Sequence, residues 1–517
     1  MRARRLTARL ATVAAAATLA ALVAAPAQAL AQDDIPGDPV DPCNRFWGGS
    51  LNRETLATSN FNYPDEFASY WGSNWPFGLP EGAEIVLRGS FPHARYMSFN
   101  TYNFYQPPVS RGPNDALSDA QIEPDPGSTN PYEPGAARDA ANRDYTIRIV
   151  SGLPPADPGD RPPNTLYTGR EPGLGVSLVY RIYLGDKGTS VDGDTGIPEA
   201  EIHLADGTVI SEESDPELAD PVCEALQVRR LGGRPQGLID VPTYAGLRTK
   251  TLVDGVEVNV PNVPPPATHP SVDPARWERF FNYRYALVGQ FYETYPGFST
   301  PLVDRSTIPS AATGGPLSNK DAYPMVAFGD RGHGELMVIH GKAPTVPSTF
   351  EGDQEMGTGQ VRYWSFCQNE FQSSEFVDCL FDEDVPIARD GTYTIVTGLS
   401  TDRPRNAKRP CGVAWLEWPS RGDGAPDYDE GGDPLGIPGT LLPPEKGGRR
   451  EMGLIAYRQL LPDPGFEHGI NSVELPGTEA AVLGDYMPTG EYVSKEEFES
   501  LACGRATVRG WGTVDRR

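Results

Sequence analysis

Three aspartates in one glycine-rich segment have the residue types and spacing of a calcium-binding loop. The segment YLGDKGTSVDGDTGIP runs from Tyr183 to Pro198 and contains Asp186, Asp192 and Asp194. Carboxylate oxygens at such spacing on a flexible loop supply ligands to Ca²⁺. The closing glutamate of an EF-hand is missing, so the alternative interpretation is a solvated β-turn. Calcium is the one cofactor that the sequence suggests.

Two tryptophans lie in a polar, glycine-bearing stretch that indicates carbohydrate binding. The stretch SYWGSNWPFG covers residues 69–78 and includes Trp71 and Trp75. Exposed aromatic rings offer flat apolar faces on which sugar rings stack. The alternative is a loop that caps a β-structure and buries both rings. We therefore name Trp71 and Trp75 as candidate ligand-binding residues.

Standard catalytic and cofactor motifs are absent from the sequence. It contains no Gly-x-Ser-x-Gly, His-Glu-x-x-His, P-loop or dinucleotide fingerprint. His333 and His340 are seven residues apart, a spacing that places them on opposite faces of a strand. The sequence therefore names no catalytic residue and leaves open whether the protein is an enzyme.

The motif Arg-Tyr-x-Ser-Phe occurs twice, at residues 95–99 and 362–366. Self-similarity of this kind is the signature of a repeated structural unit. Other short matches recur in the same order: 62–64 with 322–324, 84–92 with 335–344, 117–122 with 380–385, 145–150 with 393–398, 161–164 with 403–406, 178–184 with 454–461 and 200–204 with 471–475. This order predicts a tandem duplication, with length changes confined to loops.

An arginine and an aspartate recur in both copies, as Arg95 with Asp119 and as Arg362 with Asp382. They are either ligand clamps or a buried network that ties strand to loop. One copy of a duplicated domain can lose a site, whereas both must keep the fold. We therefore predict that the recurring residues are structural.

Glycine and proline are frequent, with 56 and 52 residues, and they separate short β-type runs. This pattern predicts an all-β protein. We expect two tandem jelly-roll-like β-sandwich domains, residues 32–210 and 316–517, with a partly helical, proline-rich connector at 211–315. The connector's expected helix is 273–292, with Asp273 as N-cap and proline next. A second short helix is expected after Ser494.

The first 31 residues have the pattern of an export signal. A basic start precedes an uncharged apolar run at 10–25, and small residues allow cleavage after Ala29 or Ala31. The later sequence contains no membrane-spanning stretch, which needs about 20 apolar residues. The net charge of −26 argues against nucleic acid and anionic membranes as partners. We expect a secreted protein.

An even number of cysteines in an exported chain favours disulfides. Cys367 and Cys379 are close in sequence and are predicted to join neighbouring strands. The remaining four are expected to pair within halves, as Cys43 with Cys223 and Cys411 with Cys503.

The first copy, from YWGSNWPF through RYMSFNTYN to YRIYL, resembles a group of exported bacterial proteins of unknown function. The resemblance implies jelly-roll-like β-domains and brings no catalytic residues. Two adjacent jelly rolls are also the plan of a secreted amidase that removes N-linked glycans, an analogy of architecture alone.

Two functions follow as hypotheses. The first is a secreted protein that binds extracellular carbohydrate or cell-envelope material. The alternative is a secreted hydrolase of glycosidase or glycan amidase type, with carboxylates where the two domains meet. A carboxylate pair at that junction would favour the hydrolase, whereas an aromatic platform without such a pair would favour binding.

Overall fold

The computed structural model describes residues 45–55, 63–75, 78–103, 113–211, 250–253, 256–259, 273–280, 319, 321–369, 376–419, 452–475, 477–501 and 503. The expected signal peptide and two of the cysteines, Cys43 and Cys223, lie outside these residues. Strands dominate the described part of the chain. No helix in it is long and apolar enough to cross a membrane.

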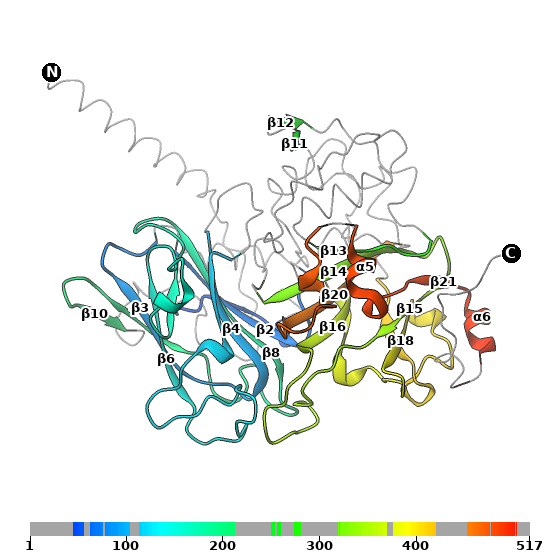
Figure 1. The fold of residues 1–517 in the computed structure, drawn as a ribbon, viewed down its shortest axis with the longest axis horizontal. Helices are drawn as coiled ribbons and strands as arrows, with labels where there is room; N and C mark the ends of the chain where they lie inside the picture. The colour runs from blue at the N-terminus through cyan, green and yellow to red at the C-terminus, as the bar shows by residue number, and fades with distance from the viewer. Residues whose placement is uncertain are drawn as a thin grey trace, which may run out of the picture. The chain divides into compact units, whose positions relative to one another are not determined.

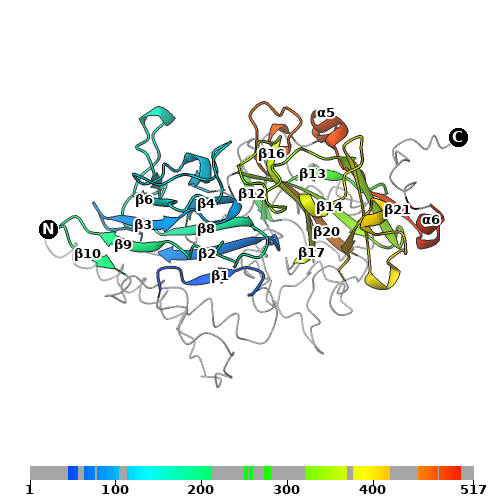
Figure 2. The ribbon, with the colours of Figure 1, turned by 90° about the horizontal axis from the view of Figure 1, so that it is seen from below.

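Two five-stranded sheets form the N-terminal half of the described chain (Figure 1). Figure 2 shows β2, β8 and β4 side by side in the first of them. Its order is β1 (Gly49–Leu51), β2 (Ala68–Trp75), β8 (Val176–Gly185), β4 (Ala94–Asn103) and β5 (Asp115–Ser118). The order of the second sheet is β10 (Val209–Ser211), β9 (Glu199–His203), β3 (Glu84–Ser90), β6 (Asp144–Val150) and β7 (Thr165–Tyr167).

The C-terminal half repeats this strand order in the described residues, except that β10 has no counterpart. One sheet runs β13 (Trp277–Arg279), β14 (Ala322–Asp330), β20 (Met452–Pro462), β16 (Val361–Asn369) and β17 (Phe376–Phe381). In the direction used for the first half, the order of the other sheet is β21 (Glu491–Val493), β15 (Leu336–Lys342), β18 (Thr392–Gly398) and β19 (Ala414–Glu417). These strands correspond to β9, β3, β6 and β7. The described chain also contains a hairpin of β11 (Lys250–Val253) and β12 (Val256–Asn259).

Short helices lie between these strands. The 3-10 turns are η2 (Asp119–Gln121), η3 (Pro158–Asp160), η7 (Asp382–Asp384), η8 (Ser400–Asp402), η9 (Arg409–Cys411), η10 (Ile470–Ser472) and η11 (Gly484–Tyr486). The α-helices are α5 (Glu479–Leu483) and α6 (Lys495–Ser500). The predicted C-terminal helix is α6, and the Ser494 side chain accepts a hydrogen bond from the Glu497 N–H at 3.1 Å.

The strand registers of the two halves also correspond. Phe99 of β4 lies opposite Tyr180 of β8, and Phe366 of β16 lies opposite Tyr457 of β20. Both ring pairs are stacked, with centroids 4.7 and 4.3 Å apart. Because a β-strand alternates its side chains between two faces, equal register places equivalent residues on equivalent faces.

Two of the predicted matches are wrong. The counterpart of β9 is β21, because β9 pairs with β3 as β21 pairs with β15, so residues 200–204 do not correspond to 471–475. The match of 62–64 with 322–324 is out of register. Ala68 lies opposite Tyr183, and Ala322 lies opposite Leu460 at the equivalent point of the second half. Residues 322–324 therefore correspond to 68–70 and not to 62–64. The false match arises because both segments contain a Tyr-Pro pair.

Each half has its own hydrophobic core, to which both of its sheets contribute. Met97 and Phe99 lie in the first core, and Trp364 and Phe366 lie in the second, as the alternation predicts. On the opposite face, Tyr96 and Tyr363 belong to one cluster shared by the two halves. The repeated strand therefore has one face for its own core and one face for the other half.

The predicted helix at 273–292 is wrong where the structure describes it. Residues 277–279 form the edge strand β13, which pairs with β14. Trp277 packs edge-on against Phe366, with ring centroids 5.9 Å apart. The proline and N-cap signals are local and weak, whereas pairing with a sheet edge satisfies the backbone and buries the tryptophan.

Two disulfides confirm predicted pairings. Cys367 and Cys379 lie directly opposite each other on β16 and β17, with Cα atoms 4.1 Å apart. Cys411 and Cys503 form the second bond. Both bonds lie within the C-terminal half.

Candidate acid–base site at the junction of the halves

The three aspartates of the predicted calcium loop do not converge in the structure. Asp186 forms an ion pair with Arg138. Asp192 and Asp194 both accept hydrogen bonds from the Ser190 side chain, and the Asp194 carboxylate also accepts from the Ser190 N–H at 2.9 Å. These contacts are those of a self-contained turn, in which local hydrogen bonds occupy the carboxylates.

The two tryptophans face the first core. Trp71 is 6% exposed, and its ring stacks on Tyr180 with centroids 5.3 Å apart. Trp75 is partly buried, and its indole N–H donates to the Ser73 hydroxyl at 2.8 Å. In this arrangement the face of Trp71 is not available to a sugar ring. The stretch is polar although its serines, Ser69 and Ser73, are buried on the same face of the strand as the two tryptophans.

The recurring arginines and aspartates pair across the two halves. Arg95 of the first half donates to Asp382 of the second at 2.5 Å, and it also contacts Glu383. Arg362 of the second half approaches Asp119 of the first at 3.4 Å. The sequence predicts a buried network that joins strand to loop. In the structure the ion pairs of this network run from one half to the other. Each aspartate also accepts from its own half's strand, from Met97 N–H at 3.2 Å and from Trp364 N–H at 3.0 Å.

Burial raises the pKa of these aspartates, and the arginines oppose the shift. The pKa of Asp119 rises to about 6, and that of Asp382 also rises. Desolvation disfavours the charged carboxylate, so the neighbouring guanidinium is needed to hold it ionised. The pairs are consistent with a structural role.

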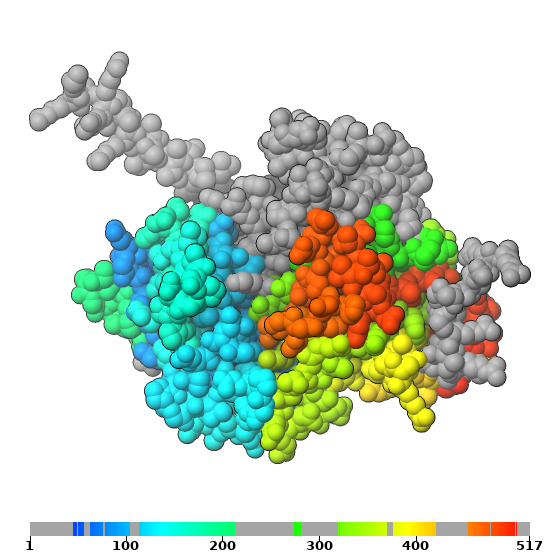
Figure 3. Space-filling view, viewed as in Figure 1, coloured from blue at the N-terminus to red at the C-terminus, as the bar shows by residue number. Residues whose placement is uncertain are grey.

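A loop of the second half also docks on the first. Backbone hydrogen bonds join Gly135 to Met356 at 2.8 Å and Arg138 to Gln354 at 2.9 Å. Met356 is 2% exposed and belongs to the first core. In Figure 3, cyan atoms of the first half meet yellow-green atoms of the second at this level. The two halves therefore share buried surface as well as ion pairs.

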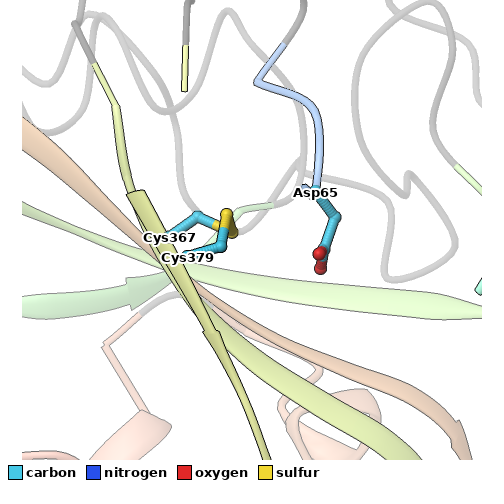
Figure 4. Close-up of side chains that lie close together, drawn as sticks. All are labelled: Asp65, Cys367 and Cys379. Carbon is cyan, nitrogen blue, oxygen red and sulfur yellow. A yellow bond between two sulfur atoms is a disulfide. The ribbon is translucent and has the colours of Figure 1, made fainter. Parts of the chain in front are cut away.

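Asp65 lies at this junction beside a disulfide (Figure 4). Its carboxylate accepts from the Ser365 hydroxyl at 2.5 Å and from the Tyr363 hydroxyl at 3.0 Å. Asp65, Cys367 and Cys379 form the one group of potential metal ligands that converges in the described residues. Because both sulfurs are in the disulfide, they are not thiolate ligands, and these residues do not fit a metal.

The next residue brings a second carboxylate to the junction. Glu66 comes from the first half, and Asp378 comes from β17 of the second half. The backbone N–H of Cys379 lowers the pKa of both carboxyl groups. Both side chains are half-buried. Two carboxyl groups, one from each half, therefore lie close enough for the charge of Asp378 to act on Glu66.

The pKa values of this pair are raised. Burial, together with the charges of Asp378 and Asp65, raises the pKa of Glu66 to about 7. Burial, with a contribution from the charge of Glu417, raises the pKa of Asp378 to about 6. Mutual repulsion and desolvation favour one shared proton on such a pair near neutral pH.

Residues around the pair hold it in place and provide an aromatic face. The Glu417 N–H donates to Asp378 at 2.7 Å, which joins the edge strands β19 and β17 of two sheets. The Glu417 carboxylate accepts from the Trp415 indole at 3.1 Å and from the Ser400 N–H at 2.7 Å. The Arg403 guanidinium lies 5.4 Å from the centre of the Trp415 ring. Trp415 is partly exposed.

None of these site residues was singled out from the sequence. Glu66, Asp378 and Glu417 carry no motif and are far apart along the chain. Only the general expectation of carboxylates at the junction pointed to them.

Comparisons with known proteins assign no family to the chain. No family model matches the sequence, and no curated protein matches it. Among solved structures, an uncharacterized protein from Burkholderia cenocepacia is 13% identical, with a TM-score of 0.40 over 85% of this chain and 79% of that one. A protein from Vibrio parahaemolyticus is 12% identical, with a TM-score of 0.34 over 88% of this chain and 98% of that one.

Proposed function

We propose that the chain is exported and folds as two tandem jelly-roll-like β-sandwich domains that arose by duplication. Matching strand orders, matching registers and a separate core for each half support this proposal. The disulfides support an oxidising location such as the extracellular space. The expected domain bounds are 32–210 and 316–517, and β13 joins the second domain from the expected connector.

We further propose that the protein is a hydrolase of extracellular or cell-envelope glycans. The observation that carries this proposal is that Glu66 and Asp378, one from each half, lie close enough for the charge of Asp378 to raise the pKa of Glu66. Glycoside hydrolysis uses a pair of carboxyl groups, one as acid and one as nucleophile or base. A carboxyl group with a pKa near the working pH is suited to proton transfer.

The chemistry follows from the two environments. Glu66 keeps its proton to about pH 7 and donates it to the departing glycosidic oxygen. Asp378 loses its proton at about pH 6. In its ionised form it acts at the anomeric carbon as the nucleophile or as the base. The backbone N–H of Glu417 holds Asp378 in place. The partly exposed Trp415 ring, with Arg403 over it, would lie beside the bound sugar.

A purely sugar-binding role has less support from the geometry. It relied on Trp71 and Trp75 as an exposed platform, and Trp71 is in the core. The carboxylate pair at the junction is the feature that distinguishes the hydrolase from a binding protein.

The test is a hydrolysis screen of the purified mature protein against bacterial cell-wall material and soluble polysaccharides. The measured signal is the release of reducing ends. Glu66→Gln and Asp378→Asn should each lower the rate by at least about 100-fold. Asp206→Asn is the control, because this exposed carboxylate accepts from the Thr208 N–H in a turn of the first half. Tight glycan binding without any hydrolysis would contradict the hydrolase and support the binding role.

A further inference from the structure

Arg143 is a buried arginine in the first half without a carboxylate contact. Its side chain is 5% exposed. One terminal nitrogen, Nη2, donates to the Arg138 carbonyl. Its Nε and Nη1 atoms have no hydrogen-bond partner among the described residues. A buried guanidinium with unused donors is costly, since desolvation of a charge must be compensated.

The fold does not require an arginine at this position. The Arg143 carbonyl accepts a hydrogen bond from the Phe91 N–H at 2.8 Å. At the equivalent point of the second half, the Gly391 carbonyl accepts from the Ala343 N–H at 2.9 Å. The second half thus makes the same backbone contact with no side chain at all. A charged side chain found in one copy alone is a better candidate for function than one that both copies share.

The charged groups near Arg143 leave its Nε and Nη1 donors without an acceptor among the described residues. The charges of Asp186 and Asp139 both act on Arg143, and Asp186 is paired with Arg138. Arg138 in turn donates to the carbonyls of Thr349 and Asp353, at 3.2 and 2.9 Å. The imidazole of His93 lies near the two guanidinium groups. His93 is half-buried, so the group reaches solvent on this side. Burial lowers the pKa of His93, and the charge of Arg143 adds to this shift, whereas the charges of Asp186 and Asp194 oppose it.

We propose that Arg143 and His93 form a binding site for one oxyanion group, either a phosphate or sulfate group or a carboxylate. The planar guanidinium matches the oxygens of such groups, and a charge-assisted hydrogen bond satisfies donors that the protein leaves unused. The site is separate from the Glu66 and Asp378 pair, so this proposal does not depend on the proposed hydrolase.

The test is thermal unfolding of the full mature chain in chloride buffer, with added inorganic phosphate, sulfate or glucuronate. A bound anion stabilises the native state in proportion to its occupancy. The wild type should show a saturable rise in Tm of several degrees with at least one of the three. The anion with the lowest half-saturation concentration identifies the source, since glucuronate points to an acidic sugar and phosphate or sulfate to an inorganic or esterified group.

The matched variant is Arg143→Gly, which copies the residue of the second half and should fold. It should lose the Tm response, whereas Arg405→Gly, at an exposed surface pair, should keep it. If Arg143→Gly fails to fold, Arg143→Lys should bind at least about tenfold more weakly because it lacks the planar fork. No response of the wild type to any of the three anions, or an equal response of Arg143→Gly, would overturn the proposal. Enclosed water would then be the acceptor for the unused donors of Arg143.

Discussion

Replacement of Arg95 by methionine should destabilise the protein far more than the same change at its counterpart, Arg362. The Arg95 side chain is fully buried, and it donates to Asp382 at 2.5 Å and to the Thr349 hydroxyl at 2.8 Å. Arg95→Met leaves the buried Asp382 without its cation. Breaking a buried pair in this way costs about 3–5 kcal/mol.

Arg362 provides the matched comparison because it occupies the equivalent position. Its side chain is 10% exposed, and its nearest contact with Asp119 is 3.4 Å. Longer contacts and some solvent screening reduce the cost of Arg362→Met to about 1–2 kcal/mol. Arg405→Met, with a side chain that is 79% exposed, should cost less than about 0.5 kcal/mol.

The assay is urea unfolding, followed by tryptophan fluorescence and by far-UV circular dichroism. Agreement between the two signals is needed before free energies are compared, because a chain of this size can unfold in steps. A cost below about 1 kcal/mol for Arg95→Met, or equal costs for both arginines, would refute the view that buried ion pairs across the junction join the halves.

Three other predictions concern packing, a junction hydrogen bond and pH. Gly341→Ala should cost about 1–3 kcal/mol in thermal unfolding, because its Cβ would lie 2.8 Å from a tyrosine hydroxyl, whereas Gly72→Ala meets nothing closer than 4.0 Å and should be nearly neutral. Tyr363→Phe should cost about 1–3 kcal/mol, because the buried Asp65 loses a donor at 3.0 Å; an unchanged Tm would contradict this. Glu66 has a pKa raised from 4.5 to about 7, so the native state holds its proton more tightly than the unfolded state, and stability should fall as pH rises from about 4.5 to about 7. After a discount for partial exposure, Glu66→Gln should remove about 1–2 kcal/mol of this fall, and parallel stability–pH curves for variant and wild type would show that the carboxyl does not titrate in this range.

The alternation of the repeated strand could be predicted from the sequence because it depends on a local rule. Met97 and Trp364 face their own cores as expected, since side chains alternate along any strand. The Cys367–Cys379 bond was predictable because neighbouring antiparallel strands bring residues of short separation together. The helix expected at 273–292 was not, because the edge of a distant sheet outweighs the local signals of its start.

Partners across the junction could not be predicted in the same way. Both halves offer an equivalent arginine and aspartate, so composition cannot distinguish pairing within a half from the observed exchange between halves. The meeting of Glu66 with Asp378 depends on how the halves pack, and it leaves no spacing or motif in the sequence. The tryptophans at 71 and 75 show the converse error, because a polar stretch on an alternating strand can still direct an aromatic ring inward.

The most direct measurement of the proposed chemistry is the pH dependence of glycan hydrolysis by the wild type, Glu66→Gln and Asp378→Asn. The wild-type rate should rise as Asp378 ionises at about pH 6 and fall as Glu66 loses its proton at about pH 7. Glu66→Gln should lose at least about 100-fold of the rate, and the upper limb of its residual activity should disappear. A wild-type protein without hydrolytic activity on any glycan, or a Glu66→Gln variant with the wild-type rate and profile, would contradict the account.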